Sequence, residues 1–146
     1  MNTKIVCFIG HRFSFRVSAK QKRVYKAIGD LIKKGYTTFY TGNMGSFDDV
    51  CEFCVLSYKY YFPKVKLYKI SATPYIKDTA SNYIYDDIIV PELEHFHYKQ
   101  RITKRNEWMV DHCDLVLCNI TNDIKSGAFN TVKYARKIGK PIIYLD

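Results

Sequence analysis

The sequence predicts an α/β fold in which a doubly wound sheet of about five mainly parallel strands carries helices on both faces. Two observations favour this fold class. Short apolar runs recur along the chain, and segments of helical periodicity, each long enough for a crossover, separate them. Crossovers of that length join parallel strands. The length of 146 residues predicts a single domain over residues 1–146.

Each expected strand is a run of apolar, β-branched or aromatic residues. The first ends at Gly10 and is continuously apolar, as expected of a strand that is buried on both faces. The expected strands cover residues 4–9, 37–41, 66–70, 115–120 and 141–145.

Four helices are expected between these strands, each with apolar residues at helical spacing and a glycine, proline or loop after it. They run from Ser18 to Gly35, from Phe47 to Pro63, from Phe96 to His112 and from Ser126 to Gly139. In the third, Ile102, Trp108 and Met109 are expected inside. Residues 72–94 lack a sustained period, so we expect an irregular excursion with a short helix near residues 78–85.

The composition limits the partners and the compartment. A net charge of +9 attracts phosphates, nucleotides or nucleic acid, although the same charge also serves solubility. No apolar run reaches the roughly 18 to 20 residues that a bilayer requires, and no leader pattern is present. We therefore expect a soluble cytoplasmic protein with no membrane partner.

The five cysteines lie inside apolar segments, which disfavours disulfides and favours a reducing compartment. Cys51 and Cys54 form a C-x-x-C pair, and with Cys113 and Cys118 they could supply four zinc ligands. The second pair is spaced too widely for a usual zinc knuckle. Because residues 51 and 54 also share a helical core face, we expect no metal site and no cofactor.

Small and polar residues follow three of the strands directly. In a doubly wound sheet, ligands bind beyond the carboxyl ends of the strands, where helix N-termini expose unpaired amides. These residues should therefore meet at one rim. They are Gly10, His11 and Arg12 after the first strand, Gly42, Asn43, Gly45, Ser46 and Asp48 after the second, and Ser126, Gly127, Asn130 and Thr131 after the fourth.

The chemistry of these residues suits an anion. Glycine lets a backbone approach a phosphate, serine and threonine offer hydroxyl donors, and Arg12 can form two bonds to phosphate oxygens. Asp48 is the exception, because a carboxylate repels phosphate; it is expected to accept from a ribose hydroxyl or to cap the second helix. Each glycine can also serve turn geometry alone, and G-x-G-x-x-G is absent.

Four motifs in this order resemble the DUF1273 or YpsA-like family of the SLOG superfamily, a Rossmann-like group that includes DprA/Smf proteins and Lonely Guy (LOG) hydrolases. The motifs are CFIGHR at residues 7–12, YTGNMGSFD at 40–48, RNEWMVD at 105–111 and SGAFNT at 126–131. The resemblance implies a nucleotide pocket and adds Arg105 and Asn106 to the expected ligand-binding residues. It also allows a homodimer.

The chain departs from this pattern in three places. Asn43 stands where the family usually has a second glycine, and Ser126 and Ala128 flank Gly127 where a Gly-Gly-Thr turn is usual, which is closer to Smf. LOG hydrolases use a glutamate on the helix after their glycine turn. Residues 131–137 contain no carboxylate, so Asp48, Glu107 or Asp111 would have to substitute.

Three functions follow from these observations. The first is binding or sensing of a nucleotide or ADP-ribose-like ligand without turnover. The second is hydrolysis of an N-glycosidic bond in a nucleoside monophosphate. The third is single-stranded nucleic-acid binding, suggested by aromatics interleaved with basic residues at 58–69 and 98–108, although most of these aromatics are expected in the core.

Overall fold

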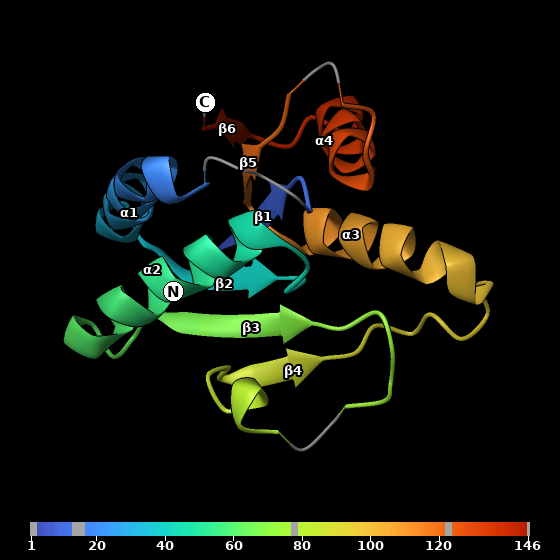
Figure 1. Cartoon of the computed structure of the whole chain (residues 1–146), viewed down its shortest axis with the longest axis horizontal. Helices are drawn as coiled ribbons and strands as arrows, with labels where there is room; N and C mark the ends of the chain where they lie inside the picture. Colours follow the sequence, from blue (N-terminus) through green and yellow to red (C-terminus); the bar gives the residue numbers. More distant parts are fainter. Residues whose placement is uncertain (1–2, 13–16, 77–78, 122–123, 146) are drawn as a thin grey trace.

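The computed structural model describes residues 3–12, 17–76, 79–121 and 124–145. Its centre is a sheet of six parallel strands in the order β4-β3-β2-β1-β5-β6 (Figure 1). The predicted α/β class and parallel sheet are therefore confirmed, with one strand more than expected. The strands are β1 (Lys4–Gly10), β2 (Tyr36–Thr41), β3 (Lys66–Ile70), β4 (Asp87–Ile89), β5 (Leu115–Asn119) and β6 (Ile142–Tyr144).

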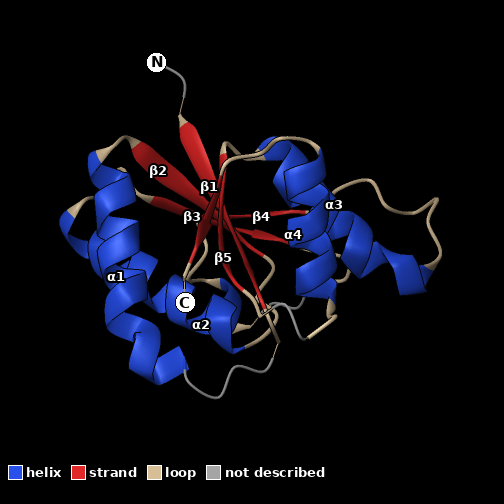
Figure 2. Ribbon diagram, turned by 90° about the horizontal axis from the view of Figure 1, so that it is seen from above, coloured by secondary structure: helices blue, strands red, loops and turns tan. Residues whose placement is uncertain are grey.

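Two helices cover each face of the sheet. Helices α1 (Val17–Lys33) and α2 (Ser46–Tyr61) lie on one side, and α3 (Arg101–His112) and α4 (Gly127–Lys137) lie on the other (Figure 2). Each side has its own core. Phe8 and Phe39 pack toward α1 and α2, whereas Ile9 packs with residues of α3 and α4. Adjacent strand residues thus face opposite cores, as a doubly wound sheet requires.

The unexpected strand lies in the segment predicted to be irregular. β4 has only three residues, and it pairs with the end of β3. Asp86 secures the approach to it, because its amide donates to Leu67 O and its carboxylate accepts from Leu67 N, both at 2.8 Å. The short helix expected near residues 78–85 is a 3-10 turn at Ala80–Asn82, and residue 78 lies outside the described part.

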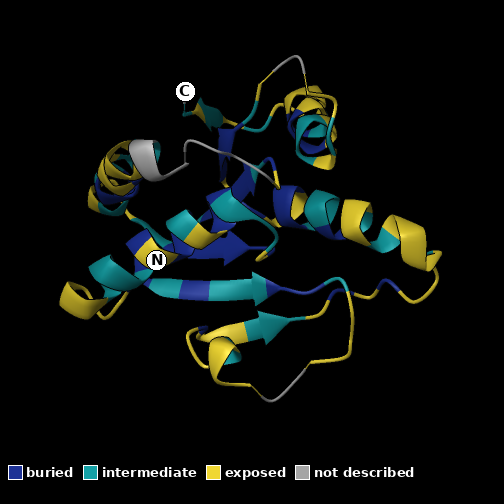
Figure 3. Cartoon of the chain, viewed as in Figure 1, coloured by how far each residue is buried: buried dark blue, intermediate teal, exposed yellow. Residues whose placement is uncertain are grey.

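The third helix is shorter than predicted and is buried at one end only. It begins at Arg101, after a 3-10 turn at Tyr98–Gln100, and its first turns project from the sheet (Figure 3). Met109 is buried as expected, but Ile102 is 40% exposed because the projecting turns have no core beneath them. The prediction that Ile102 is an inner residue was therefore wrong.

The cysteines are all buried and none is in a disulfide. Cys51 and Cys54 belong to the core beneath α1 and α2, whereas Cys113 and Cys118 belong to the core on the other side of the sheet. The four side chains therefore cannot meet around one zinc ion. As for membrane spans, the described helices are all too short or too polar to cross a bilayer.

Candidate functional site

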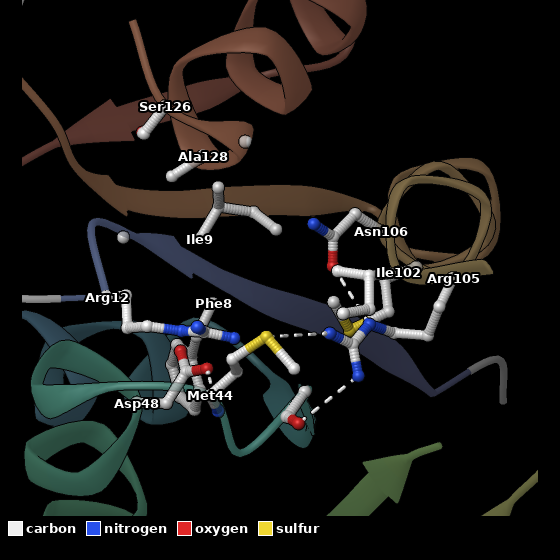
Figure 4. A pocket seen from close by; sticks show the side chains of 14 residues that line it. Phe8, Ile9, Arg12, Met44, Asp48, Ile102, Arg105, Asn106, Ser126 and Ala128 are labelled. Atoms are coloured by element: carbon white, nitrogen blue, oxygen red, sulfur yellow. Dashed lines mark hydrogen bonds between the residues drawn. The ribbon is translucent and has the colours of Figure 1, made fainter. Parts of the chain in front are cut away.

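A cavity of about 250 Å³ lies at the carboxyl ends of the central strands (Figure 4). The ends of β1 and β2 form two sides of it, and α3 and the N-terminus of α4 complete it. Eight of the fourteen predicted site residues line it, namely Gly10, Arg12, Gly42, Asp48, Arg105, Asn106, Ser126 and Gly127. The remaining lining residues are apolar or methionine: Phe8, Ile9, Met44, Ile102, Met109 and Ala128.

The glycines of this rim mostly make room for the protein itself. A Cβ atom at Gly10 would lie 2.4 Å from the Phe47 ring, and one at Gly42 would lie 2.9 Å from the Arg105 guanidinium. Gly45 has a φ of +116° and packs against the backbone of Arg12. Only at Gly127, among these four, would a Cβ atom enter open space. The expected approach of backbone to ligand is therefore available at Gly127.

The N-terminus of α4 presents unpaired donors to the cavity. Ser126 is its N-cap and accepts from the Phe129 amide at 3.2 Å. Within the described chain, the amides of Gly127 and Ala128 have no acceptor, and both residues line the cavity. In the turn after β2, by contrast, Ser46 N donates to Arg12 O and Asn43 N donates to Thr41 Oγ1. The start of α4 therefore offers free amides to an anion.

His11 holds the serine of this helix terminus in place. The His11 ring is buried, its Nε2 lies 2.9 Å from Thr121 N, and its Nδ1 lies 2.7 Å from Ser126 Oγ. Because the backbone amide can only donate, Nε2 accepts and Nδ1 donates to Ser126. Ser126 Oγ thus accepts two hydrogen bonds, and its own proton remains free to donate into the cavity.

Asp48 contributes a buried carboxylate to the cavity wall. Its Oδ2 accepts from Met44 N at 2.9 Å, which ties the first turn of α2 to the loop before it. The N-cap of α2 is Gly45, and no side chain forms a cap hydrogen bond there, so the prediction that Asp48 caps this helix was wrong. Asp48 Oδ1 is buried and has no hydrogen-bond partner among the described residues. Burial raises the pKa of Asp48 to about 7, against the opposing effect of the Met44 hydrogen bond. Near neutral pH, this group can therefore either accept or donate a proton.

Arg105 is a nearly fully buried cation on the opposite wall. Its Nη1 donates to Gly42 O at 3.2 Å and to Ile70 O at 3.0 Å, and its Nε donates to Asn106 Oδ1 at 2.9 Å. Within the described residues, no carboxylate lies within ion-pair distance of it. Burial lowers the pKa of Arg105, and the Asp48 charge partly offsets this. The guanidinium thus brings an unneutralised positive charge to the cavity.

Six predicted site residues do not line this cavity. His11 and Gly45 contact residues of the lining without lining the cavity themselves, and Asn43 lines a neighbouring cavity. Thr131 Oγ1 donates back to Gly127 O at 2.8 Å within α4. Ser46 and Asn130 also lie outside the lining. These residues shape the loops that carry the cavity rather than the cavity surface.

Glu52 is a buried residue of this region that the sequence reasoning missed. It accepts from Tyr85 OH at 2.6 Å and from Thr41 Oγ1 at 2.9 Å, so it ties α2 to the end of β2 and to the approach to β4. Burial raises the pKa of Glu52. In the sequence, the feature that could have identified Glu52 is an acidic residue among the apolar residues of a predicted helix. Glu52 does not line the cavity.

Of the three carboxylates considered as substitutes for the LOG glutamate, only Asp48 lines the cavity. Asp111 accepts from Tyr134 OH at 2.6 Å, and Glu107 pairs with Lys104 at 3.3 Å. Of these three carboxylates, Asp48 is therefore the candidate for that role.

Aromatic residues near the end of α2 are more exposed than expected. Tyr60, Tyr61 and Phe62 are 82%, 72% and 52% exposed. Helix α2 starts beside the cavity and runs antiparallel to the strands. These rings at its end therefore lie at the amino ends of the strands, opposite the cavity (Figure 1). They are not part of the site at α4.

Comparison with known proteins bears on the fold. No protein-family model and no curated protein sequence matches this chain. The structure resembles the X-ray structure of TM1055, with a TM-score of 0.63 and 16% identity, covering 95% of this chain and 72% of that one. It also resembles the Moco carrier protein of Chlamydomonas rheinhardtii, with a TM-score of 0.59 and 14% identity, covering 99% of this chain and 77% of that one. At such identity, both likenesses show the fold alone, which is a Rossmann-like α/β fold.

Proposed function

We propose that this protein binds a nucleotide or nucleotide-derived ligand in the cavity between β1, β2, α3 and α4. The observation that carries the proposal is the start of α4, where two unpaired amides and the free proton of Ser126 face the cavity. These donors and the positive end of the helix dipole suit a phosphate. The order of the four motifs favours membership of the DUF1273 or YpsA-like family.

The rest of the cavity suits the nucleoside. Ile9, Met109 and Ile102 offer apolar surface for a base or sugar ring, and Asn106 offers a side-chain amide. Asp48 Oδ1 lacks a partner in the described part of the chain, so a ribose hydroxyl or a base N–H would satisfy it. Arg12 and Arg105 supply positive charge, in keeping with the net charge of +9.

The test is calorimetric titration with AMP, compared between the protein and its Ser126→Ala variant. We expect saturable binding that weakens about tenfold in the variant, which corresponds to 1.4 kcal/mol. The matched control is Ser57→Ala, because Ser57 lies on α2 away from the cavity and bonds only Phe53 O. Absence of binding by AMP, ADP and ADP-ribose alike would refute the proposal.

A second candidate function is hydrolysis of the N-glycosidic bond of a nucleoside monophosphate, favoured by the raised pKa of Asp48 in the cavity wall. In this reaction Asp48 takes a proton from water while the water oxygen bonds to C1′. The bond between C1′ and the base nitrogen breaks, and its electron pair leaves with the base, which is then protonated. Chromatography of AMP incubated with the protein should show adenine, and Asp48→Asn should abolish its release. Unchanged AMP would rule this function out.

The exposed rings at residues 60–62 favour a third candidate, binding of single-stranded nucleic acid at the opposite edge of the sheet. Binding of an oligonucleotide that weakens steeply with salt and is lost in Tyr60→Ala would support it. Binding that is absent or insensitive to salt would exclude it.

A further inference from the structure

A second cavity of about 400 Å³ adjoins the first. It lies beyond the ends of β2 and β3 and beneath the first turns of α3. The two cavities share Gly42, Met44, Ile102 and Arg105 in their walls. A ligand that fills the first cavity can therefore reach the second past the side chains of Met44 and Ile102, of which the unbranched methionine is the more adaptable.

The two cavities differ in charge. The lining of the second includes Lys69, Arg101 and Arg105 but no aspartate or glutamate. Lys69 Nζ donates to the amide oxygen of Asn82 at 3.4 Å and lies 5.7 Å from the centre of the Tyr85 ring, and Arg101 Nε donates to the Phe96 carbonyl at 3.3 Å. In the part of the chain that the structure describes, neither Lys69 nor Arg101 forms an ion pair with a carboxylate. The described lining of the second cavity thus contains three basic residues and no acidic one.

Arg105 has donor capacity left at the boundary between the cavities. Three of its five N–H groups are used by Gly42, Ile70 and Asn106. Among the residues that the structure describes, the Nη2 amino group of the guanidinium contacts only the Met44 sulfur, at 3.9 Å, which is a weak acceptor. Figure 4 shows the Met44 side chain extending toward this amine between Asp48 and Arg105. An anion that displaces the thioether would gain a charged hydrogen bond.

Residues with hydroxyl groups also line the second cavity. Ser71 is buried directly after β3, and its Oγ donates to Thr73 O at 2.7 Å, which holds the loop in a turn. Thr73 Oγ1 accepts from Tyr75 N at 3.2 Å, so its own proton is available. Tyr98 is 67% exposed and offers a phenol hydroxyl at the outer side.

We propose that the second cavity binds a second anionic group of the same ligand, so that the ligand class is a nucleotide with two anionic groups. This inference rests on the proposed nucleotide function of the first cavity. No residue of β1 or α4 lines the second cavity, so the second group lies away from the phosphate at α4. Adenosine 3′,5′-bisphosphate, whose anionic groups flank the sugar, fits this separation better than ADP, whose phosphates are adjacent.

The experiment compares the affinities of AMP, ADP and adenosine 3′,5′-bisphosphate by calorimetry. We expect the bisphosphate to bind at least tenfold more tightly than AMP, and this gain to disappear in Arg101→Ala and in Lys69→Ala while AMP affinity stays the same. Lys99→Ala is the matched control, because Lys99 is an exposed cation near Arg101 that lines neither cavity. It should keep the gain.

The outcomes separate the two proposals. ADP, instead of the bisphosphate, could bind more tightly than AMP and lose this gain in affinity in Arg101→Ala. That result would also support the second anion site and would show that the two anionic groups of the ligand are adjacent. AMP binding without a gain from either larger ligand, or a gain that survives both substitutions, would overturn the inference and leave the proposed function intact. If none of the three ligands binds, the proposed function fails and the inference fails with it.

Discussion

The two cavities share a wall but hold their polar groups in different ways. In the first, Asp48 and Arg105 are buried and fixed by backbone hydrogen bonds, and Ser126 is oriented by His11. In the second, Arg101 is a long side chain at the start of α3, and Tyr98 lies on the 3-10 turn before it. The first cavity is thus formed by folding, whereas the second offers charge on adaptable side chains.

This difference has a thermodynamic consequence. A buried polar group without a partner destabilises the folded protein, whereas a solvated cation costs little. Substitutions of the polar side chains in the first cavity should therefore change both stability and binding, and substitutions of the cations Lys69 and Arg101 in the second should change binding only.

The largest effect is expected for Asp48→Asn. Because the pKa of Asp48 is about 7 in the folded state and 3.8 ordinarily, the folded protein binds the proton more tightly than the unfolded chain. The wild type therefore loses stability as the pH rises from about 4 to 7, by roughly 4 kcal/mol at most. The asparagine variant lacks this loss, so urea unfolding should show it to be more stable at pH 8 and equal near pH 4. A wild-type advantage at pH 8 would show that the carboxylate has a partner.

The next largest effect on stability is expected at Gly45, and Gly127 provides the comparison. Gly45→Ala places a Cβ atom 2.5 Å from the Arg12 backbone at a φ of +116°, and should cost about 3 kcal/mol. Gly127→Ala meets no atom within 4 Å, so stability should change by less than about 0.5 kcal/mol. The added methyl should nevertheless weaken AMP binding, because Gly127 lines the cavity. Denaturant titration and calorimetry measure the two effects; AMP binding unchanged in Gly127→Ala would place the phosphate elsewhere.

Ser126→Ala should have a smaller effect on stability. It removes an N-cap hydrogen bond and the acceptor of His11 Nδ1, and the free energy of unfolding should fall by about 1 kcal/mol. Stability that stays the same while AMP binding falls would show that the cap matters only for the ligand.

The smallest effect on stability is expected in the second cavity. Arg101→Ala and Lys69→Ala should each change the free energy of unfolding by less than about 0.5 kcal/mol, because neither cation is paired with a carboxylate in the described chain. Thermal denaturation without ligand measures this. A loss of 2 kcal/mol or more, on the scale of a core change, would mean that this cavity is also fixed by folding.

Local patterns in the sequence predicted most of the fold. Five apolar runs became β1, β2, β3, β5 and β6, and helical spacing located all four helices. β4 could not be predicted in this way because it has three residues and exists through pairing with β3 and the contacts of Asp86. The projecting start of α3 escaped prediction because periodicity identifies an apolar face without showing whether a core lies beneath it.

The candidate site was predicted in outline, since residues after three strands do line one cavity. The sequence could not show that Gly10 makes room for Phe47 and Gly42 for Arg105, because a glycine looks the same whether a ligand or a side chain fills the space. The contact of Glu52 with Tyr85 and the gathering of Lys69 with Arg101 join distant segments, and only the tertiary structure reveals them.

Titration of ¹⁵N-labelled protein with AMP, followed by amide chemical shifts, tests nucleotide binding at α4 most directly. We predict that the amides of Gly127 and Ala128 shift strongly and saturably, whereas those of residues 60–62, at the opposite edge of the sheet, do not. Shifts confined to residues 60–62, or no shift at any amide, would contradict nucleotide binding at α4.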